Sequence, residues 1–123
     1  MIMRILAAGL TVLAASPAAS AGEADVLKVA IMSFAKDGTW TFDVTVRHDD
    51  TGWDHYADKW DILGPDGRVL ATRVLLHPHE TEQPFTRSLD GVVIPPGVSA
   101  VTVRAHDTVH GYGGTEVTIS IPR

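Results

Sequence analysis

The chain has 123 residues, of which 45% are hydrophobic and 20% are charged, and its 15 Asp and Glu residues outnumber its 10 Lys and Arg residues. This length suits one ordinary domain rather than two. The formal net charge of −5 makes nucleic acid and anionic membrane surfaces poor candidate partners. Because the chain contains no cysteine, disulfide scaffolds, cysteine nucleophiles and thiolate metal sites are excluded.

The first 21 residues have the pattern of a secretory signal peptide. Arg4 provides the positive start, residues 5–15 the apolar middle, and Ala19-Ser20-Ala21 a small-residue cleavage site. The apolar stretch is shorter than the roughly 20 residues that a membrane span needs. We therefore expect residues 1–21 to be removed, leaving one domain of residues 22–123 in the periplasm without a membrane span.

The rest of the chain consists of short runs with the alternation typical of β-strands, separated by turn residues. Apolar residues at 40, 42, 44 and 46 alternate with polar ones across residues 39–48, which predicts a half-buried strand. The same alternation recurs over residues 101–106, where Val101, Val103 and Ala105 are the apolar members. Asp-Gly pairs and the Pro95-Pro96-Gly97 turn separate the runs. The seven predicted strands span residues 26–34, 39–48, 56–63, 68–76, 85–94, 101–106 and 117–121.

Seven strands in about 100 residues, with a turn every 8–12 residues, predict an all-β antiparallel sandwich of the immunoglobulin or fibronectin-III type. Trp60 falls in the third predicted strand, where such sandwiches often bury a tryptophan. The inter-sheet disulfide of antibody domains is not available, and no tyrosine precedes the sixth strand. A β-barrel or a jelly roll is the main alternative architecture.

The histidines after residue 21 all fall at one end of this predicted sandwich. Alternate loops of an antiparallel sandwich lie at opposite ends, so the loops after the second, fourth and sixth strands share an end. Every one of the six histidines lies in or beside these three loops, together with carboxylates and aromatic residues. The candidate metal ligands are His48, His55, His77, His79, His106 and His110, and the residues expected to support them or to recognise a partner are Asp54, Glu80, Asp107, Trp53 and Tyr112.

Imidazole is the commonest transition-metal ligand in proteins, and three or four imidazoles around one point suit Zn(II) or Cu(II). His77 and His79 are two residues apart, so in extended backbone their side chains point to the same side. His106 and His110 form a second pair beside a glycine-rich loop. We therefore predict a Cu(II) or Zn(II) site formed by some of these four histidines, with His48 or His55 completing it.

Structural roles compete with ligation at the same positions. His48 continues the inward series of its strand, so a hydrogen bond to a neighbouring loop explains it as well as a metal does. His55 fits the ordering of its own loop better than it fits a ligand. The alternative function is a metal-free interaction module, in which Trp53, Tyr112 and the same loops recognise a protein or a glycan.

Catalysis has less support in the sequence than binding. The serines of the expected domain lie in no nucleophile-elbow context, which removes support for a serine triad. Glu80 and Glu82 are paired carboxylates, but the sequence gives no cleft for them to flank. We expect a small binding protein without a nucleotide, flavin or haem.

Three segments around the histidines resemble the signature stretches of an uncharacterised family of small exported bacterial proteins. The segments are residues 53–60 (WDHYADKW), 76–87 (LHPHETEQPFTR) and 105–114 (AHDTVHGYGG). The resemblance covers essentially the whole expected domain and implies an exported β-sandwich protein. It implies no activity and no catalytic residue.

Overall fold

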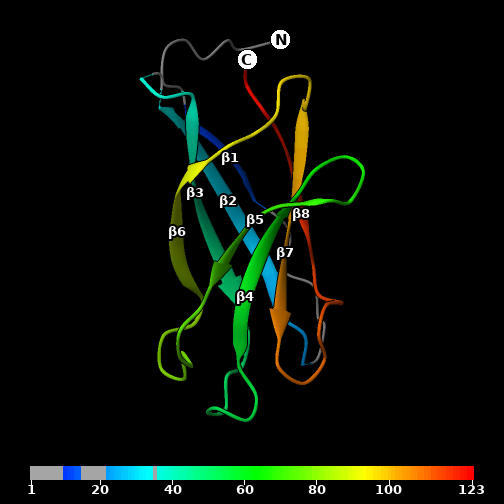
Figure 1. Cartoon of the computed structure of the whole chain (residues 1–123). Helices are drawn as coiled ribbons and strands as arrows, with labels where there is room; N and C mark the ends of the chain where they lie inside the picture. Colours follow the sequence, from blue (N-terminus) through cyan, green and yellow to red (C-terminus); the bar gives the residue numbers. More distant parts are fainter. Residues whose placement is uncertain (1–9, 15–21, 35) are drawn as a thin grey trace.

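The structure, a computed structural model, describes residues 10–14, 22–34 and 36–123. These residues form eight strands, namely β1 (Leu10–Ala14), β2 (Asp25–Phe34), β3 (Thr39–Arg47), β4 (Ala57–Leu63), β5 (Val69–Val74), β6 (Phe85–Val92), β7 (Ala100–Asp107) and β8 (Val117–Ser120). One sheet has the order β1-β2-β3-β6 and the other β5-β4-β7-β8, and neighbouring strands are antiparallel. The two sheets pack face to face as a sandwich (Figure 1).

The prediction of seven strands is wrong by one, because Leu10–Ala14 adds a strand to the free edge of β2. An apolar segment beside an unpaired strand edge gains a row of backbone hydrogen bonds by pairing there. The other seven strands lie within two residues of their predicted bounds. The rest of the predicted signal peptide, including its cleavage site, lies outside the described residues. No helix among the residues that the structure describes is long and apolar enough to cross a bilayer.

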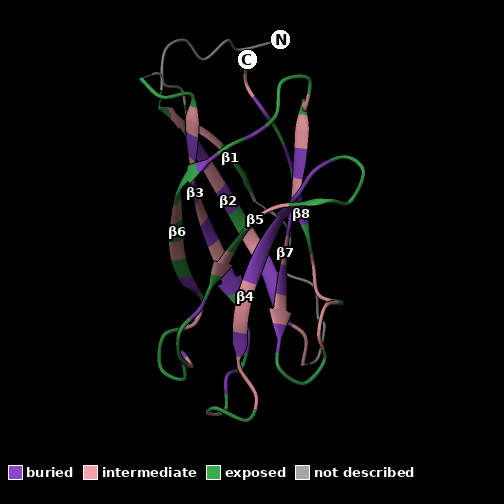
Figure 2. Cartoon of the chain, viewed as in Figure 1, coloured by how far each residue is buried: buried purple, intermediate pink, exposed green. Residues whose placement is uncertain are grey.

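The core lies between the sheets and is built by the alternating residues of the strands (Figure 2). Phe42 and Val44 of β3 and Val103 of β7 belong to this core, and each of these three side chains is fully buried. Trp60 of β4 is also fully buried, as expected. Complete burial of one such large apolar side chain contributes about 1.5–3 kcal/mol, so this alternation is what holds the two sheets together.

The inward faces of β3 and β7 end in polar residues. His48 follows Val46 by two residues, and Asp107 follows Ala105 by two, and all four side chains are buried. Because side chains alternate along a strand, the pattern that buries the two apolar residues also directs His48 and Asp107 inward. The loops β3–β4, β5–β6 and β7–β8 lie together at this end of the sandwich, which is the lower end in Figure 1.

Candidate metal site

Two side chains from the β3–β4 connection and one from the end of β7 meet at the polar end of the core, and we call His48, His55 and Asp107 the His/Asp cluster. Each side chain offers one ligand atom, and these atoms lie within 4.8 Å of one another. Nε2 of His48 is 3.1 Å from Nε2 of His55 and 3.8 Å from Oδ2 of Asp107. Two nitrogens on one tetrahedral zinc ion lie about 3.3 Å apart. The spacing of the two imidazoles therefore suits a shared metal ion.

The β3–β4 loop brings His55 back towards the core. The backbone N–H of Thr51 donates to the carbonyl oxygen of His55 at 2.9 Å, and the N–H of His55 donates to the carbonyl of Gly52 at 3.3 Å. This small turn carries the half-buried His55 ring to within 4.7 Å of the His48 ring, measured between centroids. The position of His55 thus depends on local turn geometry, whereas that of His48 depends on strand alternation.

Asp50 controls which nitrogen His48 presents to the cluster. Oδ1 of Asp50 lies 2.6 Å from Nδ1 of His48 and also accepts a hydrogen bond from the backbone N–H of Ala57 at 3.0 Å. An ionised carboxylate only accepts, so Nδ1 carries the hydrogen and Nε2 is left facing the cluster. A carboxylate behind an imidazole is the arrangement that orients metal-binding histidines in general.

Nε2 of His48 faces other electron-pair donors. The carbonyl oxygen of Gly22 lies 3.0 Å from it, on the same side as Oδ2 of Asp107. That carboxylate oxygen is buried and has no hydrogen-bond partner. A neutral His48 therefore directs its lone pair towards oxygens, and either a second ring proton or a bound cation would stabilise this arrangement.

Asp107 has one occupied and one free carboxylate oxygen. Oδ1 accepts hydrogen bonds from the backbone N–H groups of Val109 at 2.8 Å and His110 at 2.6 Å. Burial alone would raise the pKa of Asp107, but these two hydrogen bonds and the nearby imidazoles outweigh it and hold the pKa below its ordinary value. Asp107 is therefore ionised near neutral pH, with Oδ2 free to bind a cation.

His110 and Gly22 pack against each other beside the cluster. Nδ1 of His110 lies 3.3 Å from Oδ1 of Asp107, and the His110 ring centroid is 4.9 Å from that of His55. A Cβ atom placed on Gly22 would lie 2.6 Å from Cε1 of His110. Gly22 also has a φ of +93°, so its position requires a residue without a side chain for two independent reasons.

The predicted pair His77 and His79 lies in the β5–β6 loop, outside the His/Asp cluster. The two rings contact each other with centroids 4.7 Å apart, but His79 is buried and stacks on Phe85 at 4.0 Å. Burial lowers the pKa of His79, and the nearby charges of Arg87 and His77 lower it further. Stacking in the core accounts for the place of His79 without a metal.

His106 and Tyr112 also lie outside the cluster. His106 has the opposite orientation to its neighbour Asp107, and its Nδ1 lies 2.6 Å from Oδ1 of Asp58. The Tyr112 ring contacts His106 edge-on at 4.8 Å, and its hydroxyl donates to the buried Asp61 at 2.6 Å. The structure therefore separates the pair His106 and His110, because only His110 lies beside the cluster.

The remaining predicted residues, Trp53, Asp54 and Glu80, are exposed. Two residues near the cluster were not among the predicted ones. Asp50 has the same inward parity as His48, and this sequence signal could have identified it. No sequence pattern indicates Gly22, because it reaches His48 only through the tertiary fold.

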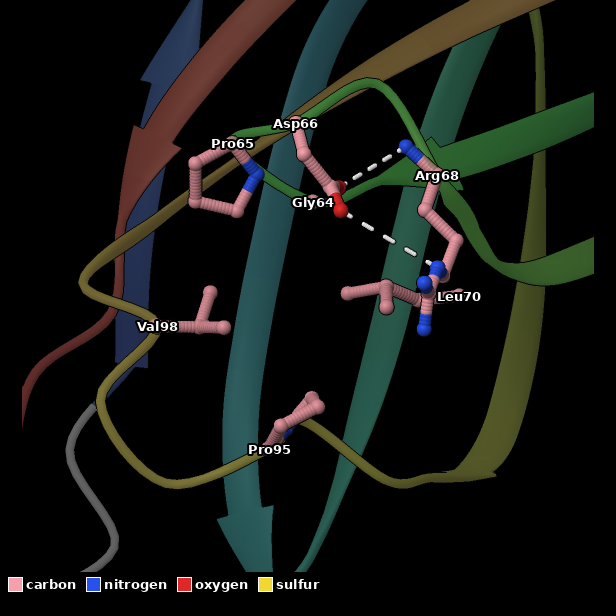
Figure 3. Close-up of a pocket in the computed structure, with 7 residues that line it drawn as sticks. All are labelled: Gly64, Pro65, Asp66, Arg68, Leu70, Pro95 and Val98. Carbon is pink, nitrogen blue, oxygen red and sulfur yellow. Dashed lines mark hydrogen bonds and ion pairs between the residues drawn. The ribbon is translucent and has the colours of Figure 1, made fainter.

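A separate pocket of about 320 Å³ lies at the opposite end of the sandwich, between the β4–β5 and β6–β7 turns (Figure 3). Proline and aliphatic side chains form much of its lining, and its charged residues Asp66 and Arg68 lie 3.9 Å apart as an ion pair. The pocket lies away from the histidines. Its lining residues are Gly64, Pro65, Asp66, Arg68, Leu70, Pro95 and Val98.

Over 97 residues the chain is 44% identical to a protein of Halomicrobium mukohataei whose description is "Putative lipoprotein". The alignment covers 79% of this chain and 47% of that protein, so the chain spans about half the length of this relative. No protein-family model matches the chain, and no solved structure matches it. The description of the relative names no ligand, so the chemistry of the site rests on its geometry.

Proposed function

We propose that this protein is exported and binds one divalent transition metal ion, Cu(II) or Zn(II), at the His/Asp cluster, for metal carriage, for sensing or as a structural ion. The observation that carries the proposal is the free Oδ2 of Asp107, buried 3.8 Å from Nε2 of His48, which in turn lies 3.1 Å from Nε2 of His55. A buried polar atom without a partner costs about 1–3 kcal/mol. A metal ion would supply that partner and would accept both imidazole lone pairs.

The donor set limits the choice of metal. Two imidazoles and one carboxylate match zinc sites in which three protein ligands leave a position open. Nitrogen and oxygen donors in a tetragonal arrangement also suit Cu(II). The cluster contains no sulfur donor, and Cu(I) prefers thiolate or thioether ligands.

Two observations support export. Residues 1–21 have the composition of a signal peptide, and the relative is described as a lipoprotein. We propose a periplasmic location, with cleavage after Ala21. Cleavage there would remove β1 and leave seven strands. The order β5-β4-β7-β8 in the second sheet supports the immunoglobulin or fibronectin-III type of sandwich.

Equilibrium dialysis against Cu(II) and Zn(II), followed by elemental analysis, tests the function. We expect one ion per chain, and at least tenfold weaker binding in His55→Ala and in the isosteric Asp107→Asn. The matched controls His77→Ala and His106→Ala remove imidazoles from the same end and should bind as the wild type does. The proposal is wrong if the wild type retains no metal, or if the control variants lose as much as the cluster variants.

A metal-free recognition module is the second candidate function. One observation favours it, because the Trp53 side chain in the β3–β4 loop is 67% exposed, next to Tyr56 at a ring separation of 5.6 Å. An exposed indole can stack on a sugar ring or receive a peptide. This function becomes the better explanation if the wild-type protein retains neither metal.

A further inference from the structure

We propose that the α-amino group of Gly22, once freed by removal of residues 1–21, is an additional nitrogen ligand of the metal. This inference rests on the proposed function and adds a regulatory step to it. In the uncleaved chain this nitrogen belongs to a peptide bond, and its lone pair is delocalised into the carbonyl group. Cleavage after Ala21 would convert it into a free amine, so export processing would complete the metal site.

Gly22 already lies against the ligands that the amine would join. Its carbonyl oxygen is 3.0 Å from Nε2 of His48, and its Cα packs on the His110 ring. The nitrogen and oxygen of one residue are three bonds apart and lie within about 3.6 Å of each other. An amine on Gly22 is therefore within reach of an ion at Nε2 of His48, and it can chelate that ion together with its own carbonyl oxygen.

The segment that follows Gly22 is held by contacts that do not involve residues 1–21. The backbone N–H of Val26 donates to the carbonyl of Thr115 at 2.8 Å, and the N–H of Thr115 donates to Oδ1 of Asp25 at 2.7 Å. A Cβ placed on Gly114 would lie 2.0 Å from the carbonyl oxygen of Ala24, so the two backbones are in direct contact. The loop between β7 and β8 thus holds the segment that follows Gly22, whether or not residues 1–21 are attached.

The amine also changes the donor set in a specific way. The His/Asp cluster alone provides two nitrogens and one carboxylate oxygen. A deprotonated amine would raise this to three nitrogens, with the Asp107 carboxylate and the Gly22 carbonyl as oxygen donors, and such a nitrogen-rich set favours Cu(II) in tetragonal geometry. We therefore expect processing to strengthen Cu(II) binding more than Zn(II) binding.

Selective ¹⁵N-glycine labelling tests this inference. The full chain is exported in a bacterial host, the processed protein is purified from the periplasm, and mass spectrometry establishes its first residue. The control protein consists of residues 21–123, in which one added alanine returns the Gly22 nitrogen to an amide. With Cu(II) bound, we expect electron–nuclear double resonance to show a directly bonded ¹⁵N only in the protein that begins at Gly22, with at least tenfold tighter binding than the control.

The outcomes separate this inference from the function on which it rests. If neither protein binds copper or zinc, the proposed function itself fails. If both bind Cu(II) equally, without a ¹⁵N coupling in the shorter one, the function stands and the amine ligand is excluded. A processed chain that begins elsewhere than Gly22 also overturns the inference. The inference is also overturned if the added alanine lowers the melting temperature of the metal-free protein but leaves the Cu(II) affinity unchanged. In that case the amine would pair with Asp107 and would not bind the metal.

Discussion

His79 is buried in the middle of the β5–β6 loop, where its ring stacks on that of Phe85 and neither ring nitrogen has a partner. Its pKa lies below the ordinary value of 6.5, because burial and the neighbouring charges of Arg87 and His77 disfavour the protonated ring. Below pH 6.5 the unfolded chain therefore binds this proton more readily than the folded protein does. We therefore expect acid to destabilise the folded protein partly through this one residue.

We expect His79 to have no pH-dependent effect on stability above about pH 6.5. As the pH falls from there towards the pKa of His79 in the folded protein, the free energy of unfolding should decrease. His79→Phe removes the titrating group and keeps a ring for stacking. Urea unfolding of the metal-free proteins at pH 7.5 and pH 5.5 measures this effect. The loss of stability between the two pH values should be smaller in the variant, and equal losses would contradict this account of His79.

Asp50 connects β3, β4 and the β5–β6 loop at the histidine-bearing end of the sandwich. Its Oδ1 contacts His48, which follows β3, and accepts from Ala57, which begins β4, while its Oδ2 accepts from the backbone N–H of His79 at 2.7 Å. The carboxylate is buried, so each of these hydrogen bonds lacks competition from water. One side chain therefore sets both the packing of two loops and the orientation of a proposed metal ligand.

In Asp50→Asn, the amide nitrogen replaces an acceptor with a donor that faces other N–H groups. We expect metal affinity to fall about 10–100-fold, as for other partners that orient ligating histidines, and stability to fall by about 1–3 kcal/mol. Competition with a chelator and urea unfolding measure the two effects. Asp49→Asn, at the exposed neighbouring position, is the control and should change neither. Unaltered affinity in Asp50→Asn would show that His48 does not depend on this carboxylate.

Strand alternation predicted most of the fold and part of the candidate site. Clear period-2 patterns in three runs, and four less regular runs bounded by turn residues, located seven of the eight strands. The count of chain reversals assigned the histidine-bearing loops to one end. The same alternation directs the side chain of Asp107 into the core and that of His106 away from it. The convergence of His55 and Gly22 on His48 could not be predicted, because it depends on a turn in one loop and on contacts between residues far apart in the chain.

At the scale of the whole molecule, a ligand that binds only the folded state stabilises it. At a free metal concentration 100 times the dissociation constant the gain is about 2.7 kcal/mol, which for a domain of this size raises the melting temperature by about 10–20 °C. Calorimetry with and without Zn(II) should show this increase, and a chelator should reverse it. Asp107→Asn should show a much smaller increase. A melting temperature that does not respond to saturating metal would contradict specific binding to the native state.

The segment at residues 22–26 is held by the loop between β7 and β8, near the end of the chain. The groups around His48 thus come from segments far apart in the sequence, because Gly22 precedes β2 and Asp107 ends β7. Under the proposed export, these groups cannot come together until the loop between β7 and β8 has followed β2 across the membrane. The proposed function then implies that the ion binds after translocation, from the metal pool outside the cytoplasmic membrane.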